Sequence, residues 1–263
     1  MATAKSGQIG ELKVQVAAAT RMLVMEGLLD YSGQVSARVP GRDAFLIQPA
    51  TAPRSSVTVD DILMVGFDGK LIEGTGRPPV EIPIHIEILK ARPDVQAVLH
   101  SHMELAIAFT MMRGVKLVPM RARAVRWESG IPMDLDPSHI KTTAQGRTLA
   151  RTLGPHHAAL MRAHGLVLVA ESVPALLVDA VHFDENARAL VTVLNAGAEP
   201  LPLTIDEREQ INRHEMRVFH VDKLWRYYVD KARTAGIFAG DKALLPDRGG
   251  LSCRQVTSVG EDH

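Results

Sequence analysis

Hydrophobic positions recur at helical spacing in three parts of the chain. Between Glu11 and Glu26 apolar residues fall about one turn apart, and Gly27 stands where a helix cap is expected. A longer apolar stripe runs through Val173–Leu194, and a charged helix is expected from about Asp206 to Val218. Each apolar stripe would pack against other secondary structure, so the pattern predicts amphipathic helices with one buried face.

Short apolar runs rich in β-branched residues alternate with these helical stretches. They are bounded by turn residues, and the Asp68-Gly69 pair between two of them is typical of a tight hairpin. The hairpin makes the predicted sheet partly antiparallel. Strands are expected within 32–39, 45–49, 64–67, 70–72, 95–99, 115–118, 158–162 and 165–170, and further helices at the Glu81 segment, 103–112 and 138–153.

Two polar segments allow more than one interpretation. Three arginines alternate over Met120–Trp127, which fits the exposed side of an edge strand or an arginine directed at an anionic substrate across a subunit boundary. His156 and His157 follow Gly154-Pro155, so we expect them in a turn at the surface rather than in a site.

The alternation of strands and helices over 263 residues predicts one α/β domain. We expect a flexible N-terminal arm over 1–10, the domain over 11–235 and a tail over 236–263. Aromatic residues gather near the end of that domain, at Trp225, Tyr227 and Tyr228. Such a cluster would cap a site or pack between subunits, and Tyr228 is the candidate for contact with substrate.

Charge and cysteine content narrow the class of partner. Thirty Lys and Arg residues balance thirty Asp and Glu residues, so no overall field favours nucleic acid or an anionic membrane. A small molecule is the expected partner. The single Cys253 excludes an internal disulfide framework, and no apolar run approaches the ~18 residues of a membrane span. We therefore expect a cytoplasmic protein.

The candidate chemistry lies between Glu81 and His102, in EIPIHIEILKARPDVQAVLHSH. Side chains alternate along the strand that includes 95–99, so His100 and His102 project from the same side and can share one ion. His164 precedes another apolar strand and supplies the third candidate ligand. A His-x-His pair alone is weak evidence, because such histidines are often ordinary core residues. His85, one helical turn after Glu81, is expected to be a core histidine or a neighbour of the site.

The combination of these segments resembles the class II aldolase/adducin family. The resemblance runs from about Leu12 to Ala196 and includes GLLDYSGQVSARVP, SVTVDDILMVGFDGKLIEG, the HSH step, MRAHGLVLVA and VPALLVDAVHFDENARAL, in the family's order. It implies a three-layer fold with a mixed, largely antiparallel sheet flanked by helices, and assembly as a homotetramer. His100, His102 and His164 match the family's metal-binding histidines, and Glu81 matches its acidic residue, a catalytic acid/base or a fourth ligand.

The expected cofactor is one divalent metal ion per subunit, Zn or Mn, with Fe or Co as alternatives. The expected substrate is a small anion. In the family's sugar-phosphate aldolases the turn at Ser32-Gly33-Gln34 contacts phosphate, so these residues are candidate substrate contacts. The loop before Glu81 carries Pro78-Pro79-Val80 in place of the hydroxyl donors common in those aldolases, and Arg77 offers a guanidinium that fits a carboxylate. Arg54, Arg121 and Arg123 are further candidates.

Among the family's activities, the chain resembles most the branch that decarboxylates hydroxylated aromatic dicarboxylates such as hydroxyphthalates and pyridine dicarboxylates. The predicted function is therefore a metal-dependent decarboxylase in which Glu81 handles the proton. Two alternatives are an aldolase or epimerase of a sugar phosphate, and a non-catalytic scaffold like the adducin branch. Retention of all three histidines and Glu81 argues against the scaffold.

Overall fold

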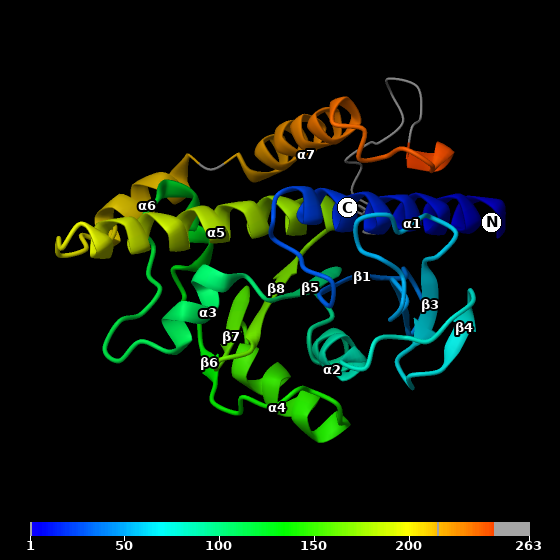
Figure 1. Cartoon of the computed structure of the whole chain (residues 1–263), viewed down its shortest axis with the longest axis horizontal. Coiled ribbons are helices and arrows are strands. Elements are labelled where there is room, and N and C mark those ends of the chain that lie inside the picture. Colours follow the sequence, from blue (N-terminus) through cyan, green and yellow to red (C-terminus); the bar gives the residue numbers. More distant parts are fainter. Residues whose placement is uncertain (1, 215, 245–263) are drawn as a thin grey trace, which may run out of the picture.

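A mixed sheet forms the centre of the structure, a computed structural model that describes residues 2–214 and 216–244 (Figure 1). Its eight strands follow the order β4-β3-β2-β1-β5-β8-β7-β6, and all neighbours are antiparallel except β6 and β7. The strands are β1 Gln34–Arg38, β2 Ala44–Ile47, β3 Leu63–Gly66, β4 Leu71–Glu73, β5 Ala97–Ser101, β6 Met133–Asp134, β7 Ala158–Met161 and β8 Gly165–Ala170.

Each face of the sheet is covered by helices, as the alternation of side chains requires. In β5, Ala97 and Leu99 join one hydrophobic core, whereas Val98 between them joins the other. One core contains residues of α1 Ala2–Met25, α3 Glu104–Thr110, α5 Val173–Asn195 and α7 Arg217–Thr234, and the other those of α2 Ile82–Ala91 and α4 Thr143–Leu153 (Figure 1). The predicted α/β fold, three layers around a largely antiparallel sheet, is confirmed.

Some helix boundaries differ from the sequence prediction. α1 begins at Ala2, because Ala, Lys and Gln near the start all favour helix. The charged helix is two elements: α6 spans Ile205–Arg213, and α7 starts at Arg217, whose Nη2 lies 2.8 Å from Asp179 Oδ2. α4 starts at Thr143, later than predicted, because Thr142 forms a capping box with Gln145.

Of the two interpretations of the alternating arginines, the edge strand is wrong. Ala122–Trp127 is a 3₁₀ helix, η1, in which Val125 and Trp127 are buried. Residues 115–118 also lie outside any strand. β7 pairs with β8 on one side and with the short parallel strand β6 on the other, so no position beside it remains for the arginine segment.

A cavity of about 300 Å³ lies among η1, α5, α6 and α7. At its wall Arg126 and Arg217 both pair with Asp179 and Glu171, which ties α7 to α5. His157 also lines this cavity and is half-buried, in contrast to the surface position expected from the sequence.

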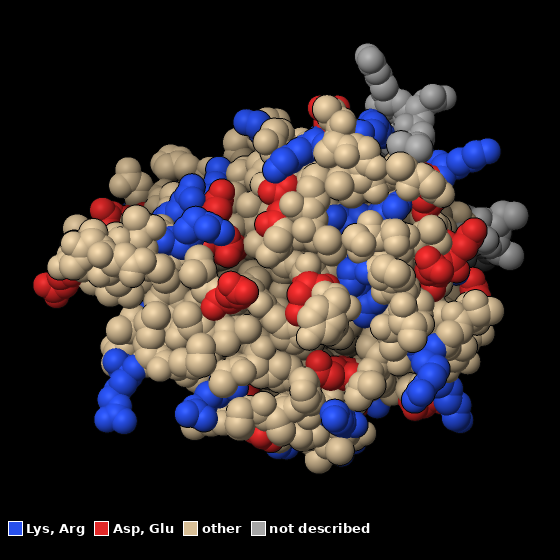
Figure 2. Space-filling view, viewed as in Figure 1, with Lys and Arg blue, Asp and Glu red and all other residues tan. Residues whose placement is uncertain are grey.

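Positive and negative side chains are interspersed over the face shown in Figure 2, as the balanced composition predicts. Within the described residues, no helix has both the length and the apolarity needed to cross a bilayer. The division into arm, domain and tail stays a prediction, and Cys253 lies outside the described residues.

Candidate metal centre

Glu81 is the N-cap residue of α2, with a proline in the first helical turn. The proline suits the start of a helix because its fixed φ and missing N–H are tolerated there. The Glu81 carboxylate makes no capping bond to its own helix, which leaves both oxygens directed elsewhere. Oε1 accepts the backbone N–H of Ile140 at 3.0 Å, so the segment before α4 fixes its orientation.

His100 occupies the same face of β5 as Val98, the face that α2 covers. Its Nδ1–H donates to the carbonyl of Leu166 on β8 at 3.1 Å, because a carbonyl can only accept. Nε2 therefore carries the lone pair, and it lies 3.3 Å from Glu81 Oε2. The neighbouring strand thus fixes the orientation of the His100 ring, with Nε2 toward Glu81.

His102 and His164 come from the adjacent ends of β5 and β8. His102 follows the last residue of β5, and His164 precedes the first residue of β8, next to Ala163 with φ 53°. The pairing of Ser101 with Leu166 places these two strand ends beside each other. His164 Nε2 lies 3.3 Å from Glu81 Oε1.

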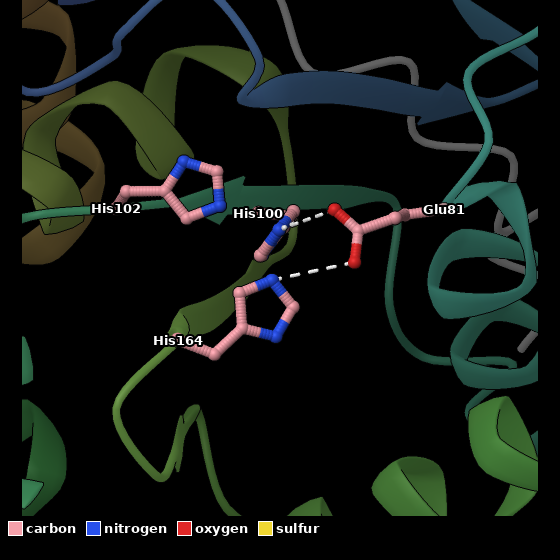
Figure 3. Close-up of side chains that lie close together, drawn as sticks. All are labelled: Glu81, His100, His102 and His164. Atoms are coloured by element: carbon pink, nitrogen blue, oxygen red, sulfur yellow. Dashed lines mark hydrogen bonds and ion pairs between the residues drawn. The ribbon is translucent and has the colours of Figure 1, made fainter. Parts of the chain in front are cut away.

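The four side chains converge on one point (Figure 3). One ligand atom from each of Glu81, His100, His102 and His164 lies within 4.8 Å of the others. The ring centroids of the three imidazoles are 4.8 to 5.5 Å apart. The sequence prediction named these four residues, and the structure brings them together; their role as ligands and catalyst stays a prediction.

Electrostatics favour the protonation states that a cation requires. Burial pushes the pKa of Glu81 upward, but His100 and His164 outweigh it and hold the pKa far below its usual value. Burial and the nearby His100 lower the pKa of His102, which keeps that ring neutral. Glu81 is therefore an ionised carboxylate and His102 a neutral imidazole, two of the donor types that zinc and similar ions take.

His164 supplies a further test of fit. Its side chain is almost wholly buried, yet neither ring nitrogen has a well-formed hydrogen bond with the residues that the structure describes. Buried polar atoms without partners are uncommon, and a cation among the four donors would satisfy Nε2. Three imidazoles also leave coordination positions for a substrate or water, as catalytic sites do and closed structural sites do not. The residues present thus fit one divalent ion.

The turn before β1 lies beside this cluster. Ser32 Oγ is 3.3 Å from His102 Nδ1, and Gln34 pairs with His100 across β1 and β5. A side-chain carbon at Gly33 would lie 2.4 Å from Leu29 Cδ1 and 3.0 Å from the carbonyl oxygen of His100, so a larger residue there would require Leu29 to move. All three positions stay predicted substrate contacts.

The other candidate side chains have varied surroundings. Arg54 is buried and donates to the carbonyls of Gly33, Pro49 and Ala52, so it is not available to a substrate in this structure. Arg77 is exposed and has no ion pair among the described residues. Burial raises the pKa of Tyr228 to about 12, and its ring packs against Tyr227 on α7. Contact of Arg77 or Tyr228 with substrate stays a prediction.

Two more candidates lie apart from the four donors. Arg121 pairs with Glu185 at 3.3 Å, and Arg123 lines the cavity beside η1, which includes none of the four. His85 is fully buried, with Nδ1 2.7 Å from Ser36 Oγ, and burial lowers its pKa to about 3. It is a buried neighbour of Glu81, as the one-turn spacing predicted.

Sequence reasoning missed three residues at this site. Asp30 Oδ2 lies 2.9 Å from His102 Nδ1, His139 Nδ1 lies 3.5 Å from Glu81 Oε1, and Gly165 stands where the ends of β5 and β8 meet. None belongs to a periodic pattern. Nothing in the sequence distinguishes His139 and Gly165 from other histidines and glycines, and only their tertiary contacts place them at the site.

Comparisons with known proteins identify the family of this chain. The family model described as Class II Aldolase and Adducin N-terminal domain matches residues 14–191. The chain is 29% identical to a 3,4-dihydroxyphthalate decarboxylase of Rhodococcus jostii (strain RHA1), over 84% of this chain and 96% of that protein. It is 33% identical to a 4-hydroxy-3-prenylphenylpyruvate oxygenase/4-hydroxy-3-prenylbenzoate synthase of Streptomyces roseochromogenus subsp. oscitans, over 62% of this chain and 60% of that protein.

Solved structures show the same fold. The L-fuculose 1-phosphate aldolase from Glaciozyma antarctica PI12 superposes with a TM-score of 0.76 at 20% identity, covering 88% of this chain and 93% of that one. At this identity the likeness concerns the arrangement of strands and helices.

Proposed function

The chain belongs to the class II aldolase and adducin family, and from that membership we propose that it is a metal-dependent decarboxylase of a hydroxylated aromatic or pyridine dicarboxylate. The coarser statement, a lyase of class II aldolase type, follows from the family and from relatives that carry decarboxylase names. The proposed metal dependence rests on one observation, the convergence of Glu81 with His100, His102 and His164, and the choice of decarboxylation is supported by the names of the relatives.

In this proposal the three histidines hold the ion and Glu81 handles the proton. A divalent ion bound there would act as a Lewis acid that polarises a substrate oxygen and stabilises the negative charge that develops in the reaction. Glu81 Oε1 and Oε2 each lie 3.3 Å from an imidazole nitrogen, so the carboxylate adjoins the position where substrate would bind. The Ile140 N–H holds Oε1 in place.

The proton balance assigns Glu81 its role. Decarboxylation replaces a ring carboxylate with hydrogen: the carbon–carbon bond breaks, its electron pair stays with the ring, carbon dioxide leaves, and one proton arrives at the ring carbon. We propose that Glu81, a carboxylate at neutral pH, would first take up a proton from solvent or from a substrate hydroxyl and then deliver it to the ring carbon.

Residues around the cluster support a carboxylate-bearing substrate. No hydroxyl side chain immediately precedes Glu81, while Arg77 in the same loop is exposed and offers a planar pair of donors. Gln34 is buried, and its Oε1 has no hydrogen-bond partner among the described residues, so this oxygen could accept from a hydroxyl group of the substrate. We assign Ser32, Gly33, Gln34, Arg77 and Tyr228 as proposed substrate contacts.

The test is carbon dioxide release from a panel of ortho-hydroxy aromatic and pyridine dicarboxylates. Metal-free protein is reconstituted separately with Mn, Zn, Fe(II) and Co. Oxygen consumption is followed in the Fe(II) sample, because the proposed decarboxylation is non-oxidative and should consume none. Release that requires metal and disappears in His164→Ala supports the decarboxylase. Absence of release with every ring and every metal would contradict it.

An aldolase or epimerase of a sugar phosphate is the second candidate. The L-fuculose 1-phosphate aldolase fold and the 30% identity to a probable L-ribulose-5-phosphate 4-epimerase over 38% of this chain favour it. Turnover of dihydroxyacetone phosphate with an aldehyde, without carbon dioxide release from the panel, would select this alternative.

We also propose a homo-oligomer, with a tetramer as the expected form. Exposed apolar side chains gather on the C-terminal helices, where Val218, Phe219 and Tyr227 are each more than half exposed. Such residues are typical of a surface that a partner covers. Light scattering after size exclusion gives the mass, and a monomer at micromolar concentration would contradict the proposal.

A further inference from the structure

We propose that Asp30 is a positioning residue that fixes the tautomer of His102 and thereby turns its Nε2 lone pair toward the other three donors. This inference rests on the proposed metal centre. Asp30 Oδ2 lies 2.9 Å from His102 Nδ1. An ionised carboxylate only accepts hydrogen bonds, so Nδ1 carries the hydrogen and Nε2 keeps the lone pair. In Figure 3 one ring nitrogen of His102 faces His100 and Glu81 and the other faces away.

The loop holds Asp30 in the orientation that this role requires. Its other oxygen, Oδ1, accepts the backbone N–H groups of Ser32 at 2.9 Å and Gly33 at 2.8 Å. The carbonyl of Gly33 in turn accepts Nε of the buried Arg54 at 2.8 Å. Because both carboxylate oxygens are engaged, Asp30 cannot rotate without losing loop hydrogen bonds, and His102 is oriented by the backbone of the turn before β1.

His100 has an equivalent outer partner, whereas His164 has none among the residues that the structure describes. The Leu166 carbonyl receives Nδ1–H of His100, as Asp30 receives Nδ1–H of His102. Outer partners of this kind fix the ring orientation and raise the basicity of metal-binding histidines. Asp30 differs from the carbonyl because it can be replaced without altering the sheet, which makes its contribution measurable.

The variant Asp30→Asn tests the positioning of His102 while it keeps the hydrogen bonds of the loop. The amide oxygen can still accept from Ser32 and Gly33, which directs the amide NH₂ at His102 Nδ1. A donor facing Nδ1 favours the tautomer with hydrogen on Nε2, and that nitrogen cannot then bind an ion. Asp68→Asn is the matched control, because Asp68 Oδ1 accepts the Lys70 N–H at 3.0 Å in the β3–β4 hairpin.

The first measurement is zinc affinity of the full chain, by competition with a chromophoric chelator and zinc alone as the probe. Loss of an outer partner typically weakens metal binding by ~10–100-fold, so Asp30→Asn should show a drop of that size and Asp68→Asn none. Unchanged zinc affinity in Asp30→Asn would overturn the inference. Thermal unfolding of the metal-free variants identifies any that fail to fold.

The second measurement reads the tautomer directly. Long-range ¹H–¹⁵N correlation of the metal-free chain should show His102 with hydrogen on Nδ1 in the wild type and on Nε2 in Asp30→Asn. A wild-type ring with hydrogen on Nε2 would overturn the inference. Failure of the wild type to bind zinc would remove the metal centre itself, whereas zinc binding without decarboxylation would contradict only the proposed reaction.

Discussion

A side-chain carbon at Gly165 would lie 3.0 Å from Cδ2 of His102. It would also lie 2.6 Å from the carbonyl oxygen of Ser101 and 3.2 Å from Cε1 of His100. The first residue of β8 is therefore pressed against the end of β5 at the point where the two strands deliver their histidines. Glycine is required there by close approach, since no side chain fits without a shift of backbone.

Gly165→Ala should weaken zinc binding and lower the stability of the metal-free chain. Overpacking of this kind typically costs ~1–3 kcal/mol, and the shift would separate His102 from His164. Zinc competition and urea unfolding measure the two effects. Gly10→Ala on α1 is the control: nothing lies within 4 Å of the added carbon, so affinity should stay constant. Wild-type zinc affinity in Gly165→Ala would show that this close approach does not shape the centre.

Glu81→Gln should reduce turnover by ~10²–10⁴-fold while the metal stays bound, because a general acid is removed and three imidazoles remain. The amide oxygen can still accept the Ile140 N–H, which preserves the local structure. Steady-state kinetics with elemental analysis of the purified variant give both quantities. Glu73→Gln on the exposed strand β4 is the control. Full activity in Glu81→Gln would exclude Glu81 as the proton donor.

The three histidines were predictable because each stands at a position that strand patterning defines. His100 and His102 are two residues apart at the end of an apolar strand, and His164 immediately precedes another strand. Glu81 was predicted from the family resemblance and not from a period. Asp30 was not predictable, because its partner His102 is distant in the chain and no spacing rule connects them. The same holds for Gly165, whose importance comes from the approach of Ser101 across the sheet.

The alternating arginines show that alternation over a few residues does not identify a strand reliably. Alternation over Met120–Trp127 fits a strand, but a run this short also fits a 3₁₀ helix when its apolar residues find a core. Here Trp127 packs edge-on against Phe183 of α5 with ring centroids 5.0 Å apart, and Arg126 joins the ion network. Tertiary contacts therefore decided the local structure.

Stability should fall as pH drops from about 6.5 to about 4, in part because of His157. Burial and the nearby Arg126 lower its pKa to about 4, so the folded state stays neutral where the unfolded chain already binds a proton. Above the pKa of the unfolded chain, His157 is neutral in both states and stability does not depend on its titration. Below that pKa, His157 binds a proton in the unfolded chain but not in the folded protein, so the unfolded state is stabilised. Because His157 is partly exposed, solvent screening makes the effect smaller, and we expect the free energy of unfolding to fall by ~1–2 kcal/mol.

Urea unfolding at pH 7 and pH 5 checks this in the wild type and His157→Gln. The variant should lose less stability between the two pH values. His156→Gln, a change at the preceding residue, whose Nδ1 lies 3.1 Å from Ser129 Oγ, should retain the wild-type difference. If His157→Gln and the wild type lose the same stability between pH 7 and pH 5, His157 does not cause the pH dependence.

Asp179→Ala should destabilise the attachment of α7 much more than Asp184→Ala on the same helix. Asp179 is almost fully buried and pairs with both Arg126 and Arg217, whereas Asp184 pairs with the exposed Arg188. Removing one member of a buried network costs ~3–5 kcal/mol; because the half-buried Glu171 still pairs with both arginines, we expect about 2–4 here and less than ~1 for Asp184→Ala.

Hydrogen exchange of Arg217–Thr234 together with denaturant unfolding distinguishes local from global loss. Faster exchange in α7 with unchanged zinc affinity would show that the network fixes α7 independently of the metal centre, since the cavity it lines contains none of the four donors. Slow exchange in Asp179→Ala would instead assign the attachment to the apolar contacts of Trp225, the fully buried residue of α7. The ion pairs would then select the orientation of the helix while apolar burial supplies its stability.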